Sequence, residues 1–162
     1  MTVTVAAEDP RSDDARALIA ALDAELSGLY EPQFNHFVSG EGLAGPGMRF
    51  FVARDGSGQP VGCVAMRPYE GFAEIKRMFV AHGARGQGIS RLLLDAVHDA
   101  ARADGFEFMR LETGDQQLAA IGLYESAGYR RCPAFGDYPA DSPHNFCYEI
   151  RLSPAETMVS HV

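Results

Sequence analysis

A single segment, from Ala73 to Ala100, constrains the fold of this chain more than any other. It begins with a strand-like run, passes through a turn at residues 85–90 and continues as an amphipathic helix. Gly86 and Gly88 let the turn adopt backbone dihedral angles that a side chain would forbid, so successive N–H groups can converge on one point. The helix adds its own free N–H groups and the positive end of its dipole. The segment therefore predicts a phosphate-binding site that needs no lysine.

The spacing around this turn distinguishes between kinds of phosphate loop. The Gly-x-x-x-x-Gly-Lys-Ser/Thr loop of nucleotide-binding proteins is absent, and the dinucleotide signature would need three glycines and a distal acidic residue. The residues fit Arg/Gln-x-x-Gly-x-Gly/Ala, with Arg85, Gly88 and Ser90 at the three defining positions. This arrangement resembles the pyrophosphate loop of the GNAT N-acetyltransferase superfamily, which binds acetyl-CoA. Ser90 stands where glycine or alanine is usual, and its hydroxyl group either caps the helix or crowds the pyrophosphate.

A second segment, Gln117–Tyr129, supports the same resemblance. It reads Gln-Leu-Ala-Ala-Ile-Gly-Leu-Tyr-Glu-Ser-Ala-Gly-Tyr, which is similar to the later family motif Asn-x-x-Ala-Ile-x-Leu-Tyr-Glu-x-x-Gly-Phe/Tyr. Gln117 replaces the asparagine of the motif, and Tyr124 matches its tyrosine. Because the two segments occur in the family's order and separation, the chain resembles a small, single-domain, bacterial-type member of this superfamily.

Hydrophobic periodicity and turn residues predict the order of the elements. Strands are expected at 2–7, 48–54, 59–68, 72–80, 106–112, 129–132 and 145–152, with helices at 13–29, 89–104 and 117–126. Segment 30–47 is either a short helix or an irregular loop, and its aromatic residues either pack on the sheet or form an acceptor-side wall. We expect a mixed α/β (α+β) protein with one domain at 1–152 and a C-terminal tail at 153–162. The resemblance implies the GNAT fold, in which a mixed, largely antiparallel sheet is splayed at its fourth strand and flanked by helices.

Strict alternation along the expected strand 72–80 predicts which residues share a face. It places Glu74, Lys76, Met78 and Val80 on one face, and Ala73, Ile75, Arg77 and Phe79 on the other. Neither face is cleanly apolar, so we expect a β-bulge that re-aims the later residues. The resemblance implies a splay at this point that admits the pantetheine arm of the cofactor.

The helix after the turn shows strong helical periodicity. Its expected buried face consists of Ile89, Leu92, Leu93, Ala96, Val97 and Ala100. His98 falls on the opposite face and is expected to be solvated.

Composition limits the possible partners and location. The chain has 162 residues and a net charge of −8, which disfavours binding to nucleic acid or to an anionic membrane and suits a cationic substrate. Its three cysteines show no paired spacing, which argues against a disulfide scaffold or a zinc site. No apolar run approaches the roughly 20 residues of a membrane span, and the N-terminus lacks the pattern of a signal peptide. We therefore expect a cytoplasmic protein.

The resemblance also implies a set of cofactor-binding residues for acetyl-CoA, which would act as a co-substrate without a metal. They lie at the end of the central strand, in the turn and at the later motif: Met78, Phe79, Val80, Arg85, Gly86, Gln87, Gly88, Ile89, Ser90 and Gln117.

Acetyl transfer to an amine predicts two catalytic residues. Because an alkyl ammonium with a pKa near ~10.4 is almost fully protonated at pH 7, a base is needed. Glu74 lies where the family often places a catalytic glutamate, although it could instead pair with Lys76 or Arg77 as a structural charge. The resemblance makes Tyr124 the acid that protonates the leaving thiolate, with a packed core tyrosine as the alternative. A backbone N–H of Phe79 or Val80 would stabilise the oxyanion.

The function predicted from the sequence is acetyl-CoA-dependent N-acetylation of a small-molecule amine. Acetylation of a protein or peptide amine is a second possibility, and a non-catalytic acyl-CoA-binding module is a third. A homodimer formed through the last strand is possible for a protein of this superfamily.

Overall fold

The computed structural model describes residues 2–29, 40–136, 138–140 and 142–153. Its elements follow the order expected from the sequence: β1 Thr4–Ala7, α1 Asp13–Leu29, α2 Gly40–Leu43, β2 Arg49–Arg54, β3 Pro60–Pro68, β4 Ala73–Val80, η2 His82–Ala84, α3 Ile89–Ala103, β5 Phe108–Gly114, α4 Leu118–Ser126, β6 Arg130–Arg131 and β7 Asn145–Arg151. Most of the aromatic segment before α2, and the tail at 154–162, lie outside the described residues. The expected domain boundary at residue 152 stays a prediction.

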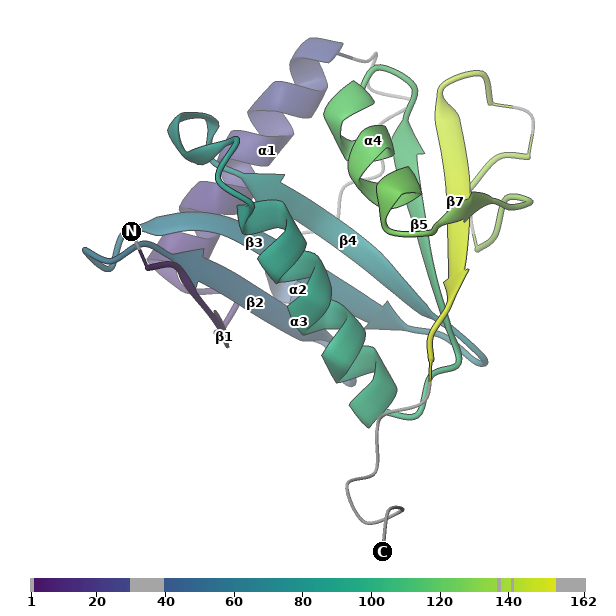
Figure 1. Cartoon of the computed structure of the whole chain (residues 1–162), viewed down its shortest axis with the longest axis horizontal. Helices are drawn as coiled ribbons and strands as arrows, with labels where there is room; N and C mark the ends of the chain where they lie inside the picture. Colours follow the sequence, from purple (N-terminus) through teal and green to yellow (C-terminus); the bar gives the residue numbers. More distant parts are fainter. Residues whose placement is uncertain (1, 30–39, 137, 141, 154–162) are drawn as a thin grey trace, which may run out of the picture.

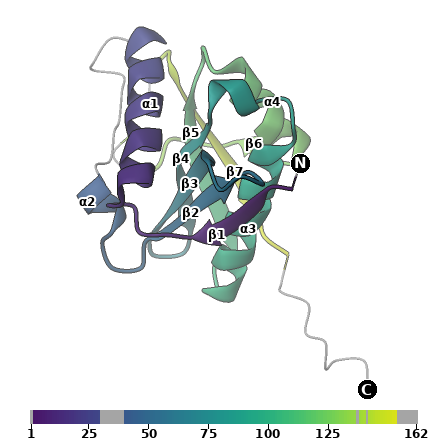
Figure 2. The same ribbon diagram turned by 90° about the vertical axis from the view of Figure 1, so that its left-hand side faces the viewer.

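One seven-stranded sheet, in the order β1-β2-β3-β4-β5-β7-β6, forms the centre of the molecule. Helix α1 covers one face, and α3 and α4 cover the other (Figure 2). Neighbouring strands are antiparallel except for β4 and β5. The expected mixed, largely antiparallel sheet with helices on both faces is therefore confirmed. None of the described helices is long and apolar enough to cross a membrane.

β4 and β5 pair over only a short stretch. Their register joins Ala73–Ile75 to Met109–Leu111, although the strands continue to Val80 and Gly114. Figure 1 shows the two strands starting side by side and separating toward their C-terminal ends. The splay expected at the fourth strand is present.

The expected β-bulge lies in the middle of β4. Cys63 pairs with Phe79 and Ala65 with Lys76, so Val64 alone faces two residues of β4. Beyond the bulge the alternation of side chains is reversed. Ile75, Met78 and Val80 all pack in the α3-side cluster, and Phe79 packs in the α1-side cluster. The strict two-face assignment is therefore wrong after Lys76, because the inserted residue shifts every later side chain to the opposite face.

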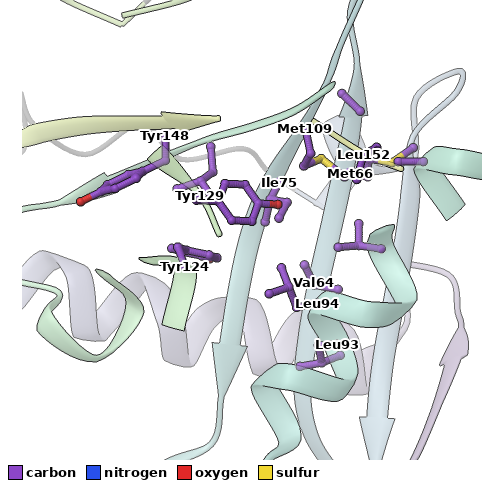
Figure 3. Close-up of a cluster of buried hydrophobic side chains, with 14 of the residues drawn as sticks. Val64, Met66, Ile75, Leu93, Leu94, Met109, Tyr124, Tyr129, Tyr148 and Leu152 are labelled. Carbon is purple, nitrogen blue, oxygen red and sulfur yellow. The ribbon is translucent and has the colours of Figure 1, made fainter. Parts of the chain in front are cut away.

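Two apolar clusters hold the helices to the sheet. The larger lies between the sheet and helices α3 and α4, and the smaller lies beneath α1. Figure 3 shows the larger cluster, with Tyr124 and Tyr129 near Ile75 and with Leu93 and Leu94 on α3. It packs α3, β4, α4 and Tyr129, which precedes β6, against one another, so it fixes the positions of the elements that surround the splay.

The buried face of α3 differs from the sequence expectation. It consists of Ile89, Leu93, Leu94, Val97, His98 and Ala101, whereas Leu92 is 44% exposed. Three successive leucines at 92–94 allow two overlapping apolar faces, and packing on the sheet selects the one that contains Leu93 and Leu94.

His98 is buried, which corrects the expectation that it is solvated. Its Nε2 lies 2.5 Å from the Tyr129 hydroxyl oxygen. Burial lowers the pKa of His98 from 6.5 to about 4, and the nearby Arg102 contributes in the same direction. His98 is therefore neutral near pH 7 and part of the α3-side core.

This histidine gives the fold a testable pH dependence. Between pH 6.5 and about 4 the unfolded chain protonates His98 while the folded chain does not. The free energy of unfolding should therefore fall as the pH is lowered through this range, on the order of 1 kcal/mol per pH unit from this residue. Urea denaturation from pH 7 to 4.5 should show a shallower pH slope for His98→Gln than for the wild type. The exposed His82 supplies the control, because His82→Gln should keep the wild-type slope. Equal slopes for wild type and His98→Gln would contradict the assignment.

Candidate active site

A cleft of about 460 Å³ opens at the C-terminal end of β4, in the part of the strand that no longer pairs with β5. Its walls come from the C-terminal half of α1, the end of β4, the turn before α3 and the start of α4. Nine of the ten predicted cofactor-binding residues line it: Met78, Phe79, Val80, Arg85, Gly86, Gly88, Ile89, Ser90 and Gln117. Gln87, the tenth, is exposed and is not part of the lining. Folding thus places residues of both sequence segments in the lining of one cleft.

The turn before α3 has the backbone that the sequence predicted. Gly86 and Gly88 have φ angles of +81° and +78°, which other residues adopt only at a cost. Space does not demand glycine here, because a Cβ atom at either position would meet nothing within 4 Å. Glycine is therefore required by the left-handed backbone, which turns successive N–H groups toward the cleft.

The first turn of α3 meets the cleft without a side-chain cap. Gly88 is the N-cap residue, and no side-chain hydrogen bond is made at this cap. Ser90 lies inside the first turn of α3 and lines the cleft. The alternative in which Ser90 caps the helix is therefore wrong. The N–H groups at this helix end can serve a ligand in the cleft instead.

Arg85 ties the turn to two other walls of the cleft. Its Nε donates to the carbonyl oxygen of Val80 at 3.0 Å, and its terminal nitrogen lies 2.7 Å from Oε2 of Glu25 on α1. Both side chains of this ion pair are 42% exposed. Glu25 on α1 thus partly neutralises the guanidinium group, and the backbone N–H groups of the turn are left as its other possible donors to an anion.

Tyr124 on α4 lies in the core behind the cleft. It is 4% exposed, and its ring makes an edge contact with Tyr129 at a centroid distance of 5.6 Å (Figure 3). Burial raises the pKa of Tyr124, and the charge of Glu112 raises it further. Leu123, its neighbour in sequence, lines the cleft, whereas Tyr124 does not. This tyrosine therefore stays protonated and can act only as a proton donor.

Glu74 is fully buried in a polar network. Its Oε1 accepts a hydrogen bond from the Tyr69 hydroxyl at 3.0 Å, and its Oε2 accepts one from the Tyr138 hydroxyl at 2.5 Å. Lys76 Nζ lies 3.5 Å from Oε2 and donates to the Tyr138 oxygen at 2.7 Å. Of the two structural partners considered for Glu74, Lys76 is nearby, while Arg77 bonds to α1.

Glu112 on β5 is a second carboxylate that the sequence reasoning missed. It lies just past the last residue that pairs with β4. Burial raises its pKa to about 7, although a hydrogen bond from Asn145 and the charge of Lys76 act in the opposite direction. Asn145 Nδ2 donates to Oε2 of Glu112 at 2.7 Å. One signal could have revealed it: Glu112 is an acidic residue in a central strand, on the same face as Arg110, which pairs in register with Glu74.

The two carboxylates and Lys76 influence one another across the splay. The charge of Glu74 raises the pKa of Glu112, and the charge of Lys76 lowers it. A carboxyl group that titrates near neutral pH beside other charged groups is typical of functional sites. Among the described residues no group of histidine, cysteine and carboxylate side chains could hold a metal ion. Neither carboxylate lines the cleft, so the chemistry that this arrangement can perform is proton transfer in a buried polar network near the end of β4.

Comparison with known proteins identifies the family. Residues 14–129 match the Acetyltransferase (GNAT) family. The "IAA acetyltransferase" of Azospirillum brasilense is 43% identical over 141 residues, which cover 86% of this chain and 92% of that protein. A Klebsiella pneumoniae crystal structure, provisionally named an acyl-CoA N-acyltransferase, has a TM-score of 0.79 and 34% identity and covers 94% of this chain and 99% of its own.

A more distant structure shows the same fold. It is a GNAT family acetyltransferase from Elizabethkingia anophelis with acetyl-CoA bound, with a TM-score of 0.67 and 19% identity over 93% of this chain and 98% of its own. Together with the splayed sheet and the turn before α3, these likenesses establish that the chain belongs to the GNAT acetyltransferase family and is an acyltransferase.

Proposed function

We propose that this chain transfers the acetyl group of acetyl-CoA to a small-molecule amine. The observation that carries the proposal is the cleft at the splay of β4 and β5, which joins an anion-binding backbone turn to apolar strand walls. The turn and the first amides of α3 would bind the pyrophosphate. The pantetheine arm would then run along Met78–Val80, which brings the thioester to the point where the two strands part. A relative that is named IAA acetyltransferase supports a small-molecule acceptor.

Acetyl transfer begins with removal of a proton from the acceptor ammonium. The neutral amine then attacks the thioester carbonyl and forms a tetrahedral intermediate with a negatively charged oxygen. Ala81 N donates to the Val61 carbonyl, so Phe79, two residues earlier, turns its N–H to the same β3 side. Val80 N–H therefore points toward the splay, and of the two predicted donors it is the better placed to stabilise the oxyanion. Collapse of the intermediate breaks the C–S bond and releases CoA thiolate, which takes a proton from Tyr124. The acylated nitrogen loses its remaining extra proton to solvent, and solvent returns a proton to Tyr124.

Two carboxylates are candidates for the base. Glu74 has the position predicted from the sequence, but it is buried, and its two carboxylate oxygens accept hydrogen bonds from Tyr69 and Tyr138. Glu112 has a pKa near the pH at which a general base is most effective. Either one would pass the proton to solvent after each turnover.

The cofactor site is tested by adding a negative charge to the turn. Gly88→Glu places a carboxylate at the N-terminus of α3 and forces a left-handed backbone on a residue with a Cβ atom. In calorimetric titration, wild type should bind acetyl-CoA with a dissociation constant of about micromolar order, and the variant should bind at least about tenfold more weakly. Gly58→Glu is the matched control, because Gly58 has a φ of +85° and equally open surroundings in the β2–β3 turn. Equal losses of acetyl-CoA affinity in both variants, or no binding of acetyl-CoA by the wild type, would contradict the assignment of the turn as the cofactor site.

The identity of the base is tested by comparing Glu74→Gln with Glu112→Gln. Thiol release should be measured from pH 5.5 to 9 with a panel of primary amines that includes putrescine, tyramine and ethanolamine. The residue that acts as base should lose about 10²-fold or more in kcat/KM when it is changed to glutamine. If the base is Glu112, wild-type kcat/KM should fall tenfold per pH unit below about pH 7, and Glu112→Gln should remove this limb. Full activity in both variants would exclude a carboxylate base.

The acid role of Tyr124 is tested by Tyr124→Phe, which keeps the ring packing against Tyr129. Turnover should fall more than tenfold while the dissociation constant of acetyl-CoA changes less than threefold, since the hydroxyl acts only after the intermediate forms. Comparable losses in turnover and in acetyl-CoA binding would contradict the acid role and leave Tyr124 with a packing role only.

A further inference from the structure

Arg77, at the bulge of β4, has an unusual backbone. Its φ is +57°, and among the described residues it is the only non-glycine residue with a positive φ. A side chain with a Cβ atom disfavours this left-handed conformation. Such strain persists only where the surrounding structure holds it, and it gathers at functional sites.

Two neighbouring elements hold Arg77 in place. Its guanidinium group reaches α1, where it donates to the Ile19 carbonyl oxygen at 3.2 Å and forms an ion pair with Asp23. Its own carbonyl oxygen accepts a hydrogen bond from the thiol of Cys63 on β3 at 3.3 Å. Arg77 is 8% exposed, and its bonds to Ile19 and Cys63 are buried, where hydrogen bonds are strong. Asp23 is 38% exposed, so solvent partly screens the ion pair.

The bulge that Arg77 forms decides what the end of β4 presents to the cleft. Pairing with β5 ends at Ile75, two residues before Arg77. After the bulge, Met78 and Val80 turn to the α3 side, and Met78–Val80 line the cleft. Without the inserted residue, these side chains and the N–H of Val80 would point to the opposite sides of β4.

The same side chain also fixes a second wall of the cleft. Ile19 and Asp23 lie on α1 within one turn of Leu22 and Glu25, which line the cleft. One arginine therefore joins the strand wall of the cleft to its helix wall.

We infer that Arg77 is a positioning residue whose bonds to α1 hold the left-handed bulge and so shape the acetyl-CoA cleft. The inference rests on the proposed function for the ligand, but it concerns how this chain builds the cleft. The arginine side chain serves to maintain a backbone conformation.

The test compares two substitutions that differ only in a methyl group. Arg77→Ala removes the bonds to α1 and keeps the backbone cost, so the bulge should be lost and acetyl-CoA should bind at least tenfold more weakly in calorimetry. Arg77→Gly removes the same bonds, but glycine adopts the left-handed backbone freely. It should therefore bind acetyl-CoA at least threefold more tightly than Arg77→Ala. A merely structural role predicts the reverse order, because glycine within a strand is the more destabilising residue.

Arg54→Ala supplies the matched control. Arg54 on β2 also binds α1, through Asp14 at 3.0 Å, and it bonds to Glu8 at 2.8 Å. The Arg54→Ala substitution should lower the free energy of unfolding without changing the affinity for acetyl-CoA.

If Arg77→Ala does not fold, Asp23→Ala replaces it, because the Asp23 substitution removes the ion pair with α1 while keeping the arginine. Asp23→Ala should weaken acetyl-CoA binding at least threefold.

Backbone ¹³C chemical shifts provide a readout that needs no cofactor. They should report a left-handed residue 77 in wild type and Arg77→Gly, and its loss in Arg77→Ala or its partial loss in Asp23→Ala. A left-handed residue 77 in all variants, or equal acetyl-CoA affinity in Arg77→Gly and Arg77→Ala, would overturn the inference. A wild type that has the left-handed bulge but binds no acetyl-CoA would instead overturn the proposed function.

Discussion

β4 and β5 stop pairing after three residues each, and the site is built around that separation. Each strand keeps its other neighbour, β3 for β4 and β7 for β5, so the sheet stays intact on both sides of the gap. The inner edges beyond Ile75 and Leu111 then carry backbone N–H and C=O groups without a ladder partner. Such groups are costly when they are buried away from water. A cleft at the end of β4 lets solvent or a polar ligand satisfy such groups.

The groups that could bind an anion at the turn before α3 are backbone N–H groups more than charged side chains. The chain carries a net charge of −8, and Arg85 already pairs with Glu25. The left-handed glycines and the first amides of α3 place fixed partial positive charges at short range, where they outweigh a distant net charge that salt screens. An acidic protein can therefore present a local site for a phosphate-bearing ligand.

The groups suited to proton transfer come from both β4 and β5 and lie apart from the turn before α3. Glu74, Glu112 and Lys76 lie close enough for their charges to affect one another. Burial raises the pKa of Glu112 to about 7. The tyrosines at 69 and 138 supply hydroxyl donors to Glu74 without adding charge. Neither carboxylate is part of the cleft lining, so these negative charges are kept apart from the turn whose backbone N–H groups could bind a phosphate.

The sequence by itself determined the elements, their order and the turn that meets the cleft. Those features depend on local chemistry: glycines that permit positive φ, apolar residues at helical spacing, and motifs within a few residues of one another. Tertiary structure alone decided that Glu112 faces Lys76, that His98 lies beside Tyr129, that Arg77 binds α1, and which face Met78 and Val80 occupy. These outcomes depend on strand register, on one inserted residue, and on which of two overlapping helix faces packs on the sheet. They join segments far apart in the chain, and burial changes the charge of a group only after those segments have met.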